Sequence, residues 1–163
     1  MTHKKAYFAG GCFWGLEELI RQEPGVIFTE VGYTGGKNDN PSYEFHPGHA
    51  EAVVITYDET KTDYTHLLDF FFRVHNPTTL NRQGNDTGSS YRSAIFYQTE
   101  EERTVAEKFI NIVNESERWD GPVVTTLEPF TNFYQAELYH QDYLQKNPGG
   151  YTCHAIYFSS YLV

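Results

Sequence analysis

Sulfur is scarce in this sequence. Its 163 residues include two cysteines, Cys12 and Cys153, and one methionine, Met1. A structural zinc site takes about four ligands and a small disulfide-built domain needs several bridges, so two cysteines exclude both kinds of scaffold. The two cysteines are therefore reactive thiols, inert thiols or one reversible pair.

Long apolar runs are also missing. No segment approaches the roughly 20 apolar residues of a transmembrane helix, and the first residues lack the apolar stretch of about 7 to 15 residues that a signal peptide requires. We therefore expect a cytoplasmic protein that does not bind membranes.

Basic side chains are few. The sequence has 12 Lys and Arg residues against 22 Asp and Glu residues, and its formal net charge is −10. Counterion release therefore cannot drive binding to nucleic acid, and we expect no nucleic-acid partner. The same charge suits a protein that stays in solution as a monomer.

Hydrophobic residues make up 39% of the chain and aromatic residues 17%, which suits one globular domain. Apolar periodicity and turn residues predict a strand at 5–9, a helix at 13–20, strands at 26–33 and 51–57, a helix at 64–75 and a strand at 91–97. The order β-α-β-β-α-β is that of a ferredoxin-like core, so the predicted fold class is α+β, an α/β two-layer sandwich.

The last third of the sequence predicts additions to this core. Thr99 and Glu102 have the spacing of a capping box, which predicts a further helix. After it we expect a strand at 123–128, a helix at about 135–145 and an irregular tail with an edge strand at 155–158.

Cys12 has the surroundings of a reactive cysteine. It follows Gly10 and Gly11 and begins a predicted helix, where unpaired backbone N–H groups and the helix dipole favour the thiolate. A cysteine is also commonly a small buried hydrophobic residue, and position alone leaves that alternative open.

The segment Gly11-Cys12-Phe13-Trp14-Gly15 resembles the signature of the A class of peptide methionine sulfoxide reductases. Further matches follow in order along nearly the whole chain, among them Val31-Gly32-Tyr33, Pro41-Ser42-Tyr43, Gly48-His49-Ala50-Glu51, Gln83-Gly84-Asn85-Asp86, Tyr91-Arg92-Ser93, Tyr139-His140-Gln141 and Gly150-Tyr151. The resemblance implies one reductase domain over residues 1–163.

The resemblance also implies a reaction. Cys12 would attack the sulfur of the S epimer of methionine sulfoxide, free or in proteins, release methionine and become a sulfenic acid. Cys153 would condense with it to a disulfide that thioredoxin reduces, and no cofactor is required. The tail must then fold back across the first turn of the first helix, and Gly149 and Gly150 would let it move.

Glu51 matches the acid of the family. Burial would keep its carboxyl protonated, and hydrogen bonds to Tyr43 and Tyr91 would place it against the sulfoxide oxygen. The resemblance makes the two tyrosines further donors to that oxygen and lets Asp86 organise water and hydroxyls. Without the resemblance, Glu51 reads as an ordinary residue at the start of a strand.

Three aromatic residues match the substrate pocket of the family. Phe13 and Trp14 would form an apolar wall for the substrate methyl group, and Tyr151 would close it, because methyl groups and sulfur pack well on aromatic rings. Phe13 also fits a plain core position of the first helix.

Other functions remain open at this stage. His49, His140 and His154 lack the spacing of a metal site, so we expect no metal. A cysteine hydrolase or amidase could use Cys12 with His49 or His140 as the base. A binding module with two buried thiols is the non-catalytic alternative.

Overall fold

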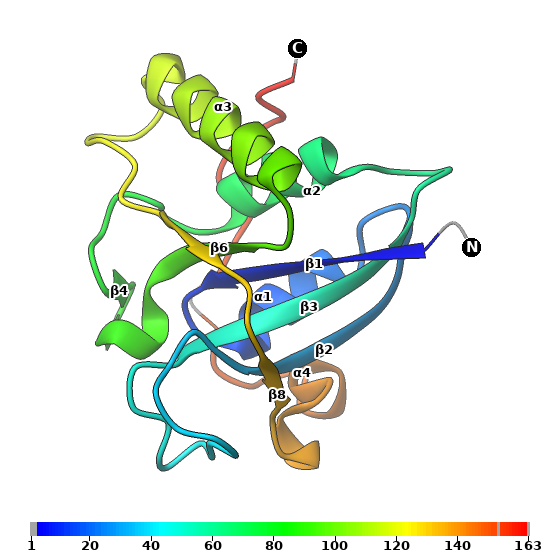
Figure 1. Cartoon of the computed structure of the whole chain (residues 1–163), viewed down its shortest axis with the longest axis vertical. Coiled ribbons are helices and arrows are strands. Elements are labelled where there is room, and N and C mark those ends of the chain that lie inside the picture. Colours follow the sequence, from blue (N-terminus) through cyan, green and yellow to red (C-terminus); the bar gives the residue numbers. More distant parts are fainter. Residues whose placement is uncertain (1–2, 153, 163) are drawn as a thin grey trace.

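The computed structural model describes residues 3–152 and 154–162. Its elements are β1 (His3–Gly10), α1 (Phe13–Ile20), β2 (Val26–Thr34), β3 (Ala50–Asp58), α2 (Tyr64–Val74), β4 (Arg82–Gln83), β5 (Asp86–Thr87), a 3-10 turn at Ser89–Tyr91, β6 (Ser93–Tyr97), α3 (Glu100–Ser116), β7 (Thr126–Pro129), β8 (Phe133–Gln135), a 3-10 turn at Leu138–His140 and α4 (Tyr143–Lys146). The main sheet has the order β7-β6-β1-β3-β2-β8 (Figure 1). Its four central strands are antiparallel neighbours, which confirms the ferredoxin-like core and the α+β class.

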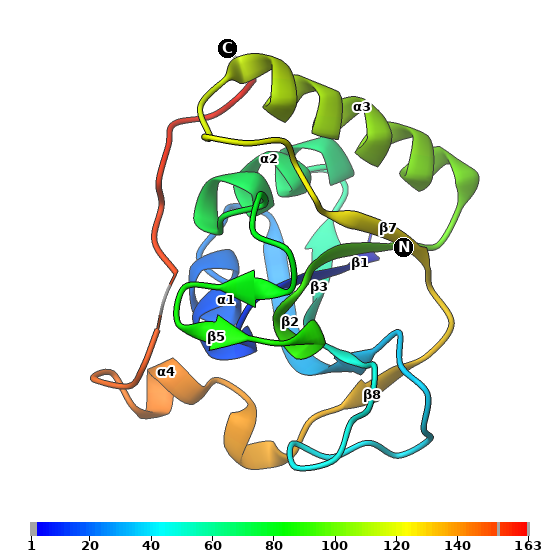
Figure 2. The same cartoon turned by 90° about the vertical axis from the view of Figure 1, so that its left-hand side faces the viewer.

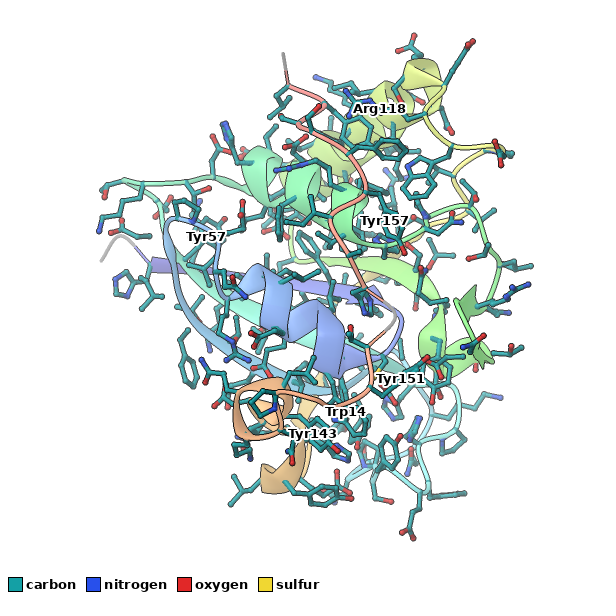
Figure 3. The ribbon with its side chains drawn as sticks, turned by 180° about the vertical axis from the view of Figure 1, so that it is seen from behind. Trp14, Tyr57, Arg118, Tyr143, Tyr151 and Tyr157 are labelled. Atoms are coloured by element: carbon teal, nitrogen blue, oxygen red, sulfur yellow. The ribbon has the colours of Figure 1, made fainter. Side chains whose placement is uncertain are left out.

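The two faces of the sheet are covered differently. Ala6 and Phe8 of β1 point into a core shared with α1, α2 and α3, whereas Tyr7 and Ala9 point to the opposite face, where Phe130 packs. Figure 3 shows α1 lying over the first of these faces.

β3 alternates in the same way, with Val53, Ile55 and Tyr57 in the core on the helix side. Because side chains alternate along a strand, Glu51 is on the same side, toward α1.

The predicted helix ends of α2 and α3 are confirmed by their contacts. The side chain of Asp63 accepts the backbone N–H of His66 at the start of α2, which ends at Val74 just before Asn76 and a proline. At the start of α3, the Thr99 hydroxyl accepts the Glu102 N–H at 3.1 Å, as a capping box requires.

The predicted helix at 135–145 is wrong. The chain instead forms β8, the second 3-10 turn and the short α4, with Asp142 in the left-handed region at φ 54°. The side chain of Gln141 accepts the Val31 N–H and donates to the Val31 carbonyl, both at 2.9 Å, as a neighbouring strand would. This segment therefore satisfies the edge of β2 instead of its own helical hydrogen bonds.

Other expectations also need correction. Residues 155–158 form no strand, and the Tyr157 N–H donates to the Arg73 carbonyl of α2 at 2.8 Å. The strand expected at 91–97 begins two residues later, at Ser93, after the first 3-10 turn. The strand expected at 123–128 is β7, which begins at Thr126, and the hairpin of β4 and β5 was not predicted.

The irregular tail crosses the molecule. It leaves α4, passes beside α1 and ends near α2 and α3 (Figure 2). Within residues 3–152 and 154–162, no helix is both long enough and apolar enough to cross a membrane.

Candidate active site at the start of α1

A glycine turn between β1 and α1 carries Cys12. Cys12 is the N-cap residue of α1 and is only 5% exposed. Gly11 has φ 92°, and a Cβ atom there would stand 2.6 Å from Cγ of Gln83. Only glycine fits this turn, which holds the thiol at the positive end of the helix.

Glu51 of β3 lies against this turn. It is 1% exposed, and its Oε1 accepts the backbone N–H of Phe13 at 3.1 Å. Burial raises the pKa of Glu51; the bond from Phe13 lowers it and the negative charge of Asp86 adds to the rise, and the net pKa is about 8. The carboxyl is therefore mostly protonated at neutral pH.

The other carboxyl oxygen, Oε2 of Glu51, is buried and has no hydrogen-bond partner among the described residues. We expected Tyr43 and Tyr91 to hydrogen-bond this carboxyl, and that detail is wrong: Oε1 accepts the Phe13 N–H, and neither tyrosine bonds either oxygen. A protonated carboxyl has one O–H group, and at Oε2 that group can donate a hydrogen bond to a bound substrate.

Tyr43 and Tyr91 both lie within electrostatic range of Glu51 and Cys12. Burial raises the pKa of both phenols, and the negative charges of Glu51 and Cys12 act on both in the same direction. Both phenols therefore stay protonated and able to donate. Glu137 holds this side of the site, because its carboxylate accepts the Tyr43 N–H at 3.0 Å and the Tyr33 hydroxyl at 2.8 Å.

An aromatic cluster lies next to the turn. Trp14 stacks on Tyr143 of α4 with ring centroids 3.8 Å apart, and its Nε1–H donates to Nδ1 of His140 at 2.9 Å (Figure 3). Phe13 is fully buried and packs on Tyr33 and His140. Trp14 therefore presents the more accessible ring, and Phe13 is also part of the core.

The tail reaches this site. The Tyr151 hydroxyl donates to Oδ2 of Asp86 at 3.1 Å, and Nε2 of His154 donates to the Gly10 carbonyl at 2.6 Å. A Cβ atom on Gly15 would stand 2.3 Å from Oγ1 of Thr152, so the tail packs directly on α1.

For Thr152 and His154, the expectation that the tail crosses the first turn of α1 is confirmed. The predicted resolving residue, Cys153, lies outside the described residues.

The histidines weigh against a hydrolase. His49 accepts the Gly36 N–H through Nδ1 and donates to the Asn38 carbonyl through Nε2, so both its ring nitrogens are occupied. His140 uses Nδ1 for Trp14, and its Nε2 is buried without a partner among the described residues. Neither histidine hydrogen-bonds Cys12, as a base for a cysteine nucleophile would.

The sequence did not predict that Glu137, His140 and Tyr143 hold the tyrosines and Trp14 of the site. His140 was considered only as a metal ligand or a base, and Tyr143 was taken as part of a longer helix. The one available signal was the match of Glu137 with Tyr139-His140-Gln141, which made this segment part of the resemblance without giving it a role.

Comparisons with known proteins agree with this geometry. A family model of peptide methionine sulfoxide reductases matches residues 4–160. The peptide methionine sulfoxide reductase MsrA of Mycobacterium sp. (strain MCS) is 60% identical over 152 residues, 93% of this chain and 89% of the relative. MsrA of Nocardia farcinica (strain IFM 10152) is 60% identical over 151 residues, again 93% and 89%.

Two solved structures have the same fold. Mxr1 from Saccharomyces cerevisiae in reduced form gives a TM-score of 0.84 at 35% identity, covering 96% of this chain and 93% of that chain. Methionine sulfoxide reductase A of Corynebacterium diphtheriae gives 0.80 at 35% identity, covering 93% and 78%. The chain belongs to the peptide methionine sulfoxide reductase family.

Proposed function

We propose that this protein reduces the S epimer of methionine sulfoxide, free and within proteins, to methionine. The observation that carries this proposal is Glu51, a buried protonated carboxyl with a vacant oxygen beside the Cys12 turn. A sulfoxide oxygen leaves sulfur only when it is protonated, and the position of Glu51 against the Cys12 turn supports it as the source of that proton.

In the first step the Cys12 sulfur bonds to the oxygen-bearing sulfur of the substrate. The oxygen passes to Cys12, methionine leaves, and the thiol becomes a sulfenic acid. Tyr43 and Tyr91 donate to the oxygen as charge develops on it, and Asp86 orders the hydroxyl groups around it. Trp14 packs against the substrate methyl group, with Phe13 behind it and Tyr151 closing the site.

In the second step the Cys153 thiol attacks the sulfenic acid. A Cys12–Cys153 disulfide forms and water is lost. The contacts of Thr152 and His154 with α1 support this step, because they bring the tail to the nucleophile.

A dithiol such as thioredoxin then reduces the disulfide and becomes oxidised itself. The yeast relative Mxr1 has also been solved in complex with Trx2, which supports a thioredoxin partner for this chain.

We also propose that residues 1–163 act as one reductase domain, as a monomer in the cytoplasm. The net charge of −10 supports the monomer, because like-charged copies repel each other. Sedimentation equilibrium would test it, and a stable dimer would reject it.

A time course on racemic methionine sulfoxide with dithiothreitol tests the function. We expect conversion to stop near one half, because only one epimer places its oxygen against Glu51. The control is Cys12→Ser, which should release no methionine. Conversion of both epimers, or conversion by Cys12→Ser, would reject the proposal.

A further inference from the structure

The two tyrosines beside Glu51 belong to different irregular segments. Tyr43 lies in the loop of residues 35–49, and Tyr91 ends the 3-10 turn after β5. Neither residue lies in a strand, so no sheet ladder sets the distance between their hydroxyl groups. Another contact must hold the two segments in register.

One side-chain pair joins the segments beside both tyrosines. Nε2 of His46 and Oγ of Ser90 are 2.7 Å apart, and Ser90 is the neighbour of Tyr91 in the chain. Nδ1 of His46 is 2.8 Å from the Ser42 carbonyl, which can only accept. Nδ1 therefore carries a proton, and Nε2 is the ring nitrogen that hydrogen-bonds the Ser90 hydroxyl.

The sheet holds the His46 ring in place. It stacks on Tyr33 of β2, with ring centroids 4.9 Å apart and planes inclined by 17°. Tyr33 is fully buried, and its hydroxyl is fixed by Glu137, which also holds the backbone of Tyr43. His46 thus links Ser90 to Tyr33 of β2, so the position of Ser90 depends on that strand.

One further hydrogen bond joins the two segments, on the other side of Tyr91. Arg92 donates to the Gly48 and Ser89 carbonyls and is paired with Glu128 of β7. Around His46 the segments leave an open depression of about 360 Å³, lined by Glu44, Phe45, His46, Pro47, Gly48, Ser89 and Ser90. The His46–Ser90 bond and the Arg92–Gly48 bond therefore flank Tyr91, and the first of them is the one whose partner, His46, lies close to Tyr43 in the chain.

We propose that His46 and Ser90 form a positioning pair that aligns the hydroxyls of Tyr43 and Tyr91 on the sulfoxide oxygen. This inference rests on the proposed function, in which those hydroxyls are donors. Neither member of the pair touches the substrate. The pair nevertheless affects the rate of reduction, because a displacement of about 1 Å in a reacting group can cost up to about 100-fold in rate.

Single-turnover methionine release by the reduced enzyme tests the pair. Ser90→Ala should lower the rate about fivefold, the equivalent of one hydrogen bond. Ser90→Thr keeps the hydroxyl and should restore the rate, and Ser89→Ala, the matched control next to it, should change nothing. His46→Ala should lower the rate as Ser90→Ala does, and the double variant should lower it no further.

A tyrosine background separates positioning from a general structural role. In the double variant Tyr43→Phe/Tyr91→Phe, Ser90→Ala should cost less than about twofold, because both hydroxyls that the pair aligns are gone. An equal loss in both backgrounds, or no loss in the parent enzyme, would overturn the proposal.

The ring resonances of Tyr43 and Tyr91 give a readout that does not depend on the reaction. They should shift in Ser90→Ala and not in Ser89→Ala, and unchanged resonances would also overturn the pair. If the parent enzyme releases no methionine, the proposed function fails, and the resonances still decide on the pair.

Discussion

The turn that carries Cys12 and the tail that crosses it are held in different ways. The turn continues β1, which is paired with β3 on one side and β6 on the other, and Gly10 faces Ser93 in the ladder. The described tail after residue 146 contains neither helix nor strand. Separate hydrogen bonds hold it, such as those from His154 to Gly10 and from the Tyr161 N–H to Asp69, together with the packing of Tyr161 in the core.

This difference matches the two halves of the reaction. Attack on the sulfoxide needs a nucleophile and an acid in fixed positions, which a paired sheet supplies. Disulfide formation and its reduction need a segment that can approach and withdraw, and a segment outside the helices and the sheet ladder opens at lower free energy than one inside them. The following predictions test whether the two regions can be impaired separately.

Cys153→Ser should abolish the second half of the reaction and leave the first half intact. The reduced variant should release one methionine per enzyme at the parent rate and then stop with thioredoxin as reductant, because the Cys12 sulfenic acid has no resolving thiol. Cys12→Ser should release none. Repeated thioredoxin-driven turnovers by Cys153→Ser would show that the tail does not resolve the intermediate.

Glu51→Gln should impair the turn alone. A general acid contributes about 100-fold or more, so single-turnover methionine release should fall by about that factor at pH 7. The loss should be smaller at pH 5.5, where solvent supplies protons, and the parent rate should itself fall above the pKa of Glu51, about 8. A rate that Glu51→Gln leaves unchanged across this range would refute the acid.

Stability gives an independent check on Glu51. Its pKa is about 8 in the folded protein against an ordinary value of 4.5, so the folded state binds more protons between these values. The free energy of unfolding should therefore fall as pH rises from 4.5 to 8. Glu51→Gln should remove that part of the fall, and urea denaturation at both ends would measure it.

Gly15→Ala should impair the tail alone. The new methyl group would meet Thr152 and Nδ1 of His154 at 2.3 and 2.5 Å, and the His154 bond to Gly10 would be lost. Thioredoxin-driven cycling should slow about fivefold, the equivalent of one hydrogen bond, while single-turnover release stays unchanged.

The control for this substitution is Gly121→Ala, whose Cβ atom would meet nothing within 4 Å. It should change neither rate. Equal slowing of both steps by Gly15→Ala would mean that the tail and the turn are one rigid unit.

The fixed region was also the more predictable one. The periodicity of 13–20 gave α1 with Cys12 at its start, and the alternation along β3 explains why Glu51 faces α1. These features depend on residues close together in the sequence. The bond from Phe13 to Glu51 joins residues 38 apart, so the sequence alone led us to the wrong donors.

The segment after β8 shows a limit of prediction from the sequence pattern. Residues 135–145 contain enough helix-forming residues to predict a helix, but Gln141 bonds the backbone of Val31. The helix propensity of a segment does not decide its structure where the segment can instead hydrogen-bond the unpaired backbone groups of a strand far away in the sequence. The pairing of His46 with Ser90, residues 44 apart, was hidden for the same reason.

The far end of the tail should give the smallest effect. The Tyr161 hydroxyl donates to the Phe72 carbonyl at 3.1 Å and accepts Nε1–H of Trp119 at 2.9 Å. Tyr161→Phe leaves both partners unsatisfied and should lower the free energy of unfolding by about 1 to 3 kcal/mol. Tyr139→Phe, which removes a hydroxyl from a side chain 58% exposed, should cost less. Cycling should stay at the parent rate, since this anchor lies beyond the segment that moves; slowing comparable to Gly15→Ala would place the hinge of the tail here instead.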